Sequence, residues 1–253
     1  MSPDEHSAPR YREPLLGVVF DLDGTLVVSN QNFPKMRKEV IRIAELHGVM
    51  PGHLSPREPT ARLISAADAE LERSGVVEAL RHRFLADVHR VIDAIEMEAL
   101  PTTHARPGAG ELLQALEERG YRIGLLTRSC DAFCRAALQR TGLAPHFPFL
   151  RTRSAAGPAK PSPDALLLLL HDMGVPPARA LFVGDHTMDA ECAVGARVRF
   201  YGILEETPGP DSITVERFRA SGADAVAKNL TDLAQFIGVA VRAPRPTAPP
   251  VHP

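Results

Sequence analysis

Two carboxylates lie where an apolar segment near the N-terminus gives way to a glycine turn. Asp21 and Asp23 follow residues 17–20 and precede Gly24, in the run Gly-Val-Val-Phe-Asp-Leu-Asp-Gly. A buried strand that ends in this way holds one carboxylate rigidly and directs the second across a tight turn, for which Gly24 has the backbone freedom. Like charges this close repel unless a cation or a reacting group offsets them. The pair therefore predicts a nucleophile beside an acid or base, sharing a hard divalent ion, although a plain strand with an Asp-Gly turn has the same pattern.

Two further positions could bind a phosphoryl group. Thr127 ends an apolar run and precedes Arg128 and Ser129, so its hydroxyl and the N–H groups of the following helix are suited to phosphoryl oxygens. Lys160 precedes a helix that starts with proline, and its ammonium could neutralise both a nucleophile and a transferring phosphoryl group. The alternatives are an ordinary helix cap for Thr127 and a solvated surface position for Lys160.

A second pair of carboxylates follows another apolar run. Asp185 and Asp189 occur in Leu-Phe-Val-Gly-Asp-His-Thr-Met-Asp, beginning at position 181. Asp185 is placed to coordinate a cation, while Asp189 either joins the metal site through water or orients its neighbours. An acidic residue in the first turn of a helix is the alternative for Asp189.

Short apolar runs alternate with helical patterns along most of the chain. We expect strands at 15–20, 121–127, 147–150, 180–183, 197–203 and 224–227, and helices between them at 109–119, 132–141, 163–173, 188–195 and 230–239. This alternation is typical of an α/β fold with a parallel sheet and helices on both faces. The carboxyl ends of such strands, where the polar motifs lie, form the ligand-binding edge of open α/β sheets.

A long helical interval interrupts the alternation after the first strand. Helical patterns at 35–47, 61–74 and 77–98 indicate an inserted all-helical cap domain. We expect a core domain of residues 15–29 and 104–241 and a cap of residues 30–103. Residues 1–14 and the proline-rich 242–253 are too polar or proline-rich to pack, and they are predicted to be disordered tails.

Composition excludes several classes of function. The 253 residues are 44% hydrophobic with a formal net charge of −2, so the chain has no electrostatic footprint for nucleic acid. The sequence has no apolar stretch long enough to span a bilayer and no secretory signal, and we expect a cytoplasmic protein. Three cysteines, an odd number, argue against a disulfide framework.

The order of these motifs resembles that of the haloacid dehalogenase-like (HAD) hydrolase superfamily. The sequence Asp-x-Asp-Gly-Thr, a strand ending in Thr, Lys-Pro and Gly-Asp-x-x-x-Asp match its four motifs over residues 15–240, and the helical insert resembles the cap of the phosphoglycolate phosphatase-like branch. The resemblance implies a Rossmann-like core and Mg²⁺-dependent phosphoryl transfer through an aspartyl-phosphate.

The resemblance also implies roles for single residues. Asp21 would be the nucleophile and Asp23 the general acid and base, while Thr127 and Lys160 would bind the phosphoryl group. Asp185 would complete the Mg²⁺ site with Asp21 and the backbone carbonyl of Asp23, and Asp189 belongs to the same acidic set. Arg128, beside Thr127, is a candidate contact for a second phosphate or carboxylate of the substrate.

We therefore expect a phosphatase acting on a small phosphorylated metabolite, as a monomer or a homodimer. A phosphomutase is the mechanistic alternative, since the same aspartyl-phosphate can be handed to a sugar hydroxyl when water is excluded. A non-catalytic binding or regulatory protein is the second alternative, although the crowded carboxylates argue against it. Carbon–halogen hydrolysis is disfavoured, because dehalogenases of the superfamily lack a carboxylate at the position of Asp23.

Overall fold

The computed structural model describes residues 14–205 and 212–240. Six of the described strands form one parallel sheet in the order β5-β4-β1-β6-β7-β8. The strands are β1 (Gly17–Phe20), β4 (Arg122–Leu126), β5 (Phe149–Arg151), β6 (Ala180–Gly184), β7 (Arg199–Ile203) and β8 (Ala225–Ala227). The order changes direction after β1, so the carboxyl ends of β1, β4 and β6 meet at a topological switch point.

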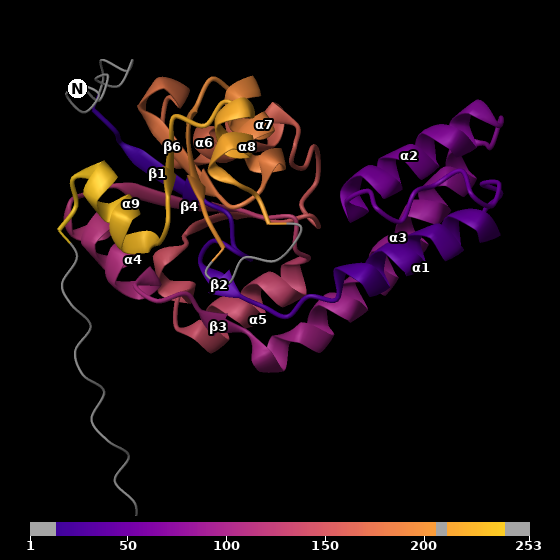
Figure 1. Cartoon of the computed structure of the whole chain (residues 1–253), viewed down its shortest axis with the longest axis horizontal. Helices are drawn as coiled ribbons and strands as arrows, with labels where there is room; N and C mark the ends of the chain where they lie inside the picture. The colour runs from indigo at the N-terminus through magenta and orange to yellow at the C-terminus, as the bar shows by residue number, and fades with distance from the viewer. Residues whose placement is uncertain (1–13, 206–211, 241–253) are drawn as a thin grey trace, which may run out of the picture. The chain divides into compact units, whose positions relative to one another are not determined.

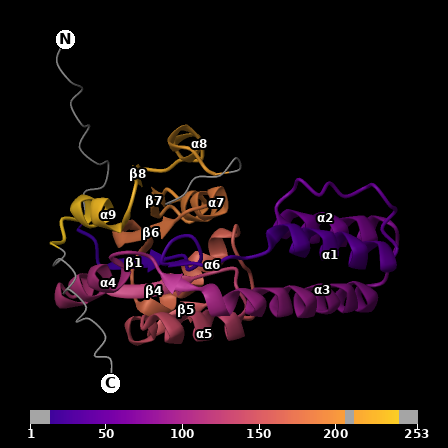
Figure 2. The same cartoon turned by 60° about the horizontal axis from the view of Figure 1, so that its bottom comes forward.

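Helices cover both faces of this sheet (Figures 1 and 2). The helices α6 (Pro163–Met173), α7 (Thr187–Gly195) and α8 (Val215–Ala220) pack in sequence on one face. The helices α4 (Ala109–Glu118), α5 (Asp131–Thr141) and α9 (Leu230–Ile237) belong to the other face, as right-handed crossovers between parallel strands require. The described residues also include short 3₁₀ turns at Leu100–Thr102, Ala144–His146 and Pro177–Arg179.

The central strand β1 is buried along its whole length. Such a strand has helices on both faces, so a continuous apolar run replaces the alternating pattern of a half-exposed strand. On the α6 and α7 face, Val19 and Phe182 belong to a core cluster that includes Leu166, Leu169 and Phe200. Because this core holds the strands in place, the backbone positions of the residues just after their carboxyl ends are also well defined.

Residues Ser29–Thr103 form a separate compact unit. It contains α1 (Phe33–Leu46), α2 (Thr60–Arg73) and α3 (Glu78–Ala99), which bury an apolar cluster of their own around residues such as Val40 and Phe84. The amphipathic spacing of these helices explains the cluster, because each contributes one apolar face. The unit follows β2 (Val27–Val28) and precedes β3 (His104–Ala105), which pair antiparallel with each other.

The predicted fold class is confirmed: a parallel sheet with helices on both faces. Helix α8 and the small β2–β3 pair were not predicted, because they are too short to show a clear periodicity. The predicted tails lie outside the described residues except for Pro14, whose carbonyl accepts a hydrogen bond from Arg179 Nε at 3.0 Å. Among the described residues, no helix combines the length and apolar character needed to cross a bilayer.

Candidate active site

Asp21 lies directly after β1, at the carboxyl edge of the sheet. Its backbone N–H donates to the Val183 carbonyl at 2.9 Å, which continues the pairing between β1 and β6 beyond the strand. The residue is 9% exposed. Asp21 therefore follows a strand that is buried along its whole length, while its carboxylate keeps limited access to a ligand.

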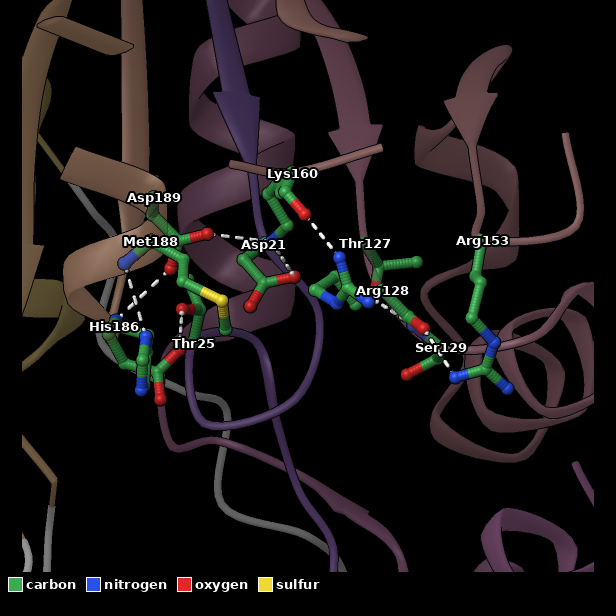
Figure 3. Close-up of polar contacts among 11 residues, drawn as sticks. Asp21, Thr25, Thr127, Arg128, Ser129, Arg153, Lys160, His186, Met188 and Asp189 are labelled. Atoms are coloured by element: carbon green, nitrogen blue, oxygen red, sulfur yellow. Dashed lines mark hydrogen bonds and ion pairs between the residues drawn. The ribbon is translucent and has the colours of Figure 1, made fainter. Parts of the chain in front are cut away.

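Lys160 reaches the same edge from the loop between β5 and α6 (Figure 3). Its Nζ lies 2.7 Å from Asp21 Oδ1 and 2.7 Å from Asp189 Oδ1. Burial alone would lower the pKa of Lys160, but Asp189 and Asp21 outweigh it and raise this pKa above its usual value. Burial raises the pKa of Asp21, Lys160 partly offsets that rise, and Asp189 adds to it. The ammonium thus stays charged and neutralises part of an acidic cluster.

Asp185 follows β6 and lies among other carboxylates. Burial and the charges of Asp21, Asp189 and Asp23 raise its pKa well above 3.8. The buried Thr25 hydroxyl donates to Asp185 Oδ1 at 2.9 Å, which favours the charged form and opposes the rise. Such mutual repulsion among carboxylates is the condition that a bound cation relieves.

Asp189 lies in the first turn of α7 and is almost fully buried. Oδ1 faces Lys160, and Oδ2 accepts a hydrogen bond from the His186 N–H at 3.0 Å. His186 caps the same helix, with Nδ1 accepting from the Met188 N–H at 3.1 Å; burial and Lys160 lower its pKa, so the ring is neutral near pH 7. Both Asp189 oxygens have donors, which favours its predicted role of orienting neighbours over metal coordination.

Thr127 follows β4 and is buried beside Asp21 (Figure 3). Its Oγ1 accepts from the Ser129 N–H at 3.1 Å, which orients the hydroxyl while its own proton can still be donated. The Arg128 guanidinium donates to the Lys160 carbonyl, and Arg153 Nη1 donates to the Arg128 carbonyl at 2.8 Å. Arg128 therefore joins the loop after β4 to the loop that carries Lys160; its contact with substrate stays a prediction.

The turn after β1 brings Asp23 to the same cluster. Gly24 donates from its N–H to the Val27 carbonyl at 2.8 Å and has a φ of +80°. A Cβ on Gly24 would lie 2.1 Å from Asp185 Oδ2, so this position needs glycine both for its backbone conformation and for the approach of the carboxylate. Asp23 is half-buried, and its charge contributes to the raised pKa of Asp185.

The residues present fit a hard divalent cation. Carboxylate oxygens of Asp21, Asp185 and Asp189 lie within 4.8 Å of one another, and an all-oxygen set of this kind suits Mg²⁺. Because Asp189 is engaged by Lys160 and by the His186 N–H, Asp21 and Asp185 are the carboxylates best placed to hold the ion.

The family is decided by comparison with known proteins. The sequence model of the family described as haloacid dehalogenase-like hydrolase matches residues 15–197, a stretch that contains Asp21, Thr127, Lys160, Asp185 and Asp189. The chain belongs to this family. The predicted resemblance is thereby confirmed.

Relatives with assigned names include several phosphatases. The N-acetylmuramic acid 6-phosphate phosphatase of Pseudomonas aeruginosa is 30% identical over 208 residues, which cover 79% of this chain and 88% of that protein. Phosphoglycolate phosphatase 1 of the same organism is 29% identical over 187 residues, covering 72% of this chain and 66% of that protein. The pyrophosphatase PpaX of Bacillus pumilus is 25% identical over 232 residues, covering 87% and 95%.

Solved structures share the fold. A haloacid dehalogenase-like hydrolase from Bacteroides fragilis superposes with a TM-score of 0.62 at 22% identity, covering 87% of this chain and 99% of that chain. A HAD family hydrolase from Deinococcus radiodurans, with bound phosphate and sodium, gives a TM-score of 0.59 at 22% identity, covering 89% and 96%. At these identities the likeness concerns the fold.

Three residues near the HAD motifs were not singled out from the sequence. Thr25 contacts Asp185, Arg153 contacts the Arg128 carbonyl, and Arg106 donates to the Gly24 carbonyl. Thr25 is the last residue of the first motif, and this position was the available signal, although no role was assigned to it. Arg106 and Arg153 lie in loops with ordinary polar composition, and nothing in the local sequence marks them.

Proposed function

We propose that this protein is a Mg²⁺-dependent phosphatase that hydrolyses a small phosphomonoester through an aspartyl-phosphate on Asp21. One observation carries the proposal: a rigidly held carboxylate, Asp21, lies 2.7 Å from a buried ammonium at the ligand-binding edge of the sheet, within reach of Asp185. Membership of the HAD-like hydrolase family and the phosphatase names of its relatives support the same reaction class.

In the first half-reaction, an Asp21 oxygen attacks phosphorus while the bond between phosphorus and the ester oxygen breaks. The leaving alkoxide takes a proton from the Asp23 carboxyl group. Lys160 and the Thr127 hydroxyl face the charge on the phosphoryl oxygens, which is where such transition states need stabilisation. Arg128 holds the Lys160 loop beside Thr127, so both phosphoryl contacts belong to one connected scaffold.

In the second half-reaction, water attacks the phosphorus of the aspartyl-phosphate, and the bond from phosphorus to the Asp21 oxygen breaks. Asp23, now a carboxylate, takes the proton from that water and returns to its starting state. When bound, Mg²⁺ would offset the negative charge of Asp21, Asp185 and the phosphoryl group; Asp21, Asp185 and the Asp23 backbone carbonyl would hold it. Asp189 keeps Lys160 in place throughout.

The relatives' names define the first substrates to examine. They act, by name, on N-acetylmuramic acid 6-phosphate, phosphoglycolate and pyrophosphate, and sugar phosphates and nucleoside monophosphates complete a reasonable set. This proposal includes three further points. Residues 30–103 act as a cap that selects the substrate, the protein is cytoplasmic, and it is a monomer or a homodimer.

The deciding experiment measures inorganic phosphate release from these phosphate compounds, for wild type and Asp21→Asn, with Mg²⁺ or with a chelator. We expect release that requires both Mg²⁺ and Asp21. Full activity of a folded, Mg²⁺-supplied Asp21→Asn protein would refute the mechanism. Formation of an isomeric sugar phosphate in place of free phosphate would identify a phosphomutase.

A further inference from the structure

A buried arginine is connected to the turn that carries the first HAD motif. Arg106 directly follows β3 and is 2% exposed. Its backbone N–H donates to the Leu26 carbonyl at 2.8 Å, and its Nη1 donates to the Gly24 carbonyl at 2.8 Å. Its Nη2 donates to the carbonyl of Leu204, the residue after β7. One side chain thus joins two segments that are far apart in the sequence.

The chemistry of the guanidinium suits this connection. Arginine is rarely buried without hydrogen-bond partners, because desolvating its charge is costly. Its planar fork has fixed donor directions, so two acceptors bound at once define the position of each relative to the other. Arg106 therefore fixes the position of the Gly24 carbonyl relative to the end of β7, a strand of the main sheet.

The anchored peptide lies between two residues of the site. Asp23, the proposed acid and base, precedes Gly24, and Thr25, which donates to Asp185, follows it. Gly24 has a φ of +80°. Because glycine has no side chain, its backbone could also adopt several other conformations. The hydrogen bond from the buried Arg106 guanidinium to the Gly24 carbonyl removes much of this backbone freedom.

We infer that Arg106 is a positioning residue: it fixes the Asp23–Thr25 turn so that the Asp23 carboxyl group meets the leaving oxygen. This inference rests on the proposed function. A displacement of about 1 Å in a catalytic group can cost about 10²-fold in rate, so the loss of the anchor should be visible in kinetics while the sheet stays folded.

The dependence on the leaving group separates positioning from general destabilisation. An alkyl phosphate needs a proton on its departing oxygen, whereas p-nitrophenyl phosphate releases a stable phenolate and needs general acid catalysis far less. A misplaced Asp23 therefore penalises the alkyl ester selectively. Partial unfolding would lower the activity toward both esters by the same factor.

The test compares kcat/KM for the best alkyl phosphomonoester of the substrate set and for p-nitrophenyl phosphate. Arg106→Met removes the guanidinium donors with similar bulk, and Arg106→Lys keeps the charge without the fork. Asp23→Asn is the reference for lost acid catalysis. Arg122→Met is the control for a lost guanidinium away from the site: Arg122 is exposed and also donates to two backbone carbonyls, those of Met173 and Gly174, from the opposite end of β4.

We expect Arg106→Met to lower kcat/KM for the alkyl ester by about 10²-fold and for p-nitrophenyl phosphate by less than about 10-fold, following Asp23→Asn. Arg106→Lys should show the same selectivity with a smaller loss, which keeps the test valid if the Met variant folds poorly. Arg122→Met should leave the ratio of the two esters unchanged.

Two kinds of failure can be told apart. If wild type hydrolyses no phosphomonoester, the proposed function fails. If wild type is active and Asp23→Asn shows the selective loss, but the Arg106 variants lose activity equally on both esters or not at all, then only the positioning role of Arg106 is overturned.

Discussion

Replacing Asp189 by Asn tests whether this carboxylate orients Lys160 or binds the metal ion. The change keeps the shape of the side chain and removes a buried negative charge 2.7 Å from Lys160 Nζ. Asn has a single acceptor oxygen, so it can keep the hydrogen bond from either Lys160 or the His186 N–H, while its NH2 group faces the other donor. What is lost is half of the charge compensation that Asp21 and Asp189 give to the buried ammonium.

The magnitude follows from that geometry. Opposite unit charges 2.7 Å apart attract by about 6 kcal/mol at an effective dielectric constant of ~20. Desolvation cancels part of this attraction, and breaking one partner of a buried ion pair costs about 3–5 kcal/mol. Asn can retain one hydrogen bond, so we expect a loss of about 3 kcal/mol, which lowers Tm by about 6–12 °C in a chain of this size.

Thermal unfolding gives the stability, and the Mg²⁺ dependence of phosphate release gives the role. We expect Asp189→Asn to reduce kcat by about 10-fold or more, because Lys160 is no longer held between two carboxylates, while the Mg²⁺ concentration for half-maximal activity stays within about twofold of wild type. Asp131→Asn is the control: its ion pair with Arg135 also measures 2.7 Å but is solvent-exposed, and its loss should change Tm by less than about 2 °C.

The opposite pattern would refute the reasoning. An Asp189→Asn protein with a wild-type Tm and a more than tenfold higher Mg²⁺ requirement would show that Asp189 is a metal ligand and that Lys160 is held by other means.

Three further predictions concern the same edge and the core. Asp185→Asn should raise the Tm of metal-free protein near pH 7.5 and abolish the stabilisation by Mg²⁺ in calorimetry. The pKa of Asp185 is higher in the folded protein than its ordinary value of 3.8, so wild-type stability falls as pH rises from 3.8 to the folded-state pKa. The gain in Tm from the substitution should therefore shrink toward about pH 4. Gly24→Ala should lower kcat by about 10²-fold or more in phosphate-release assays, because its Cβ meets Asp185 at 2.1 Å, whereas Gly120→Ala has a similar φ of +77° with open space around it and should cost stability alone. Burial raises the pKa of the Cys134 and Cys192 thiols to about 12, so a thiol reagent at pH 8 should label them in denaturant and leave them intact in the native protein; rapid native labelling would contradict their burial.

Much of the core was accessible from the sequence because its signals are local. The apolar run before Asp21 predicted a buried strand, and β1 is buried throughout. The helix predicted at 163–173 coincides with α6, which begins at a proline and ends before a left-handed glycine. Helix α8 has six residues, less than two turns, so its pattern did not stand out from a loop.

Which side chains follow which strands can be read directly from the order of residues. In a parallel sheet, strand ends meet at one edge whatever the details of packing, so Asp21, Thr127 and Asp185 had to gather there. Their hydrogen-bond and ion-pair partners, in contrast, come from the folded structure alone. Asp189 forms an ion pair with Lys160, and the Thr25 hydroxyl donates a hydrogen bond to Asp185, a residue 160 positions away in the sequence. Such pairings depend on distances of a few tenths of an ångström between separate loops, which residue types and spacing do not encode locally.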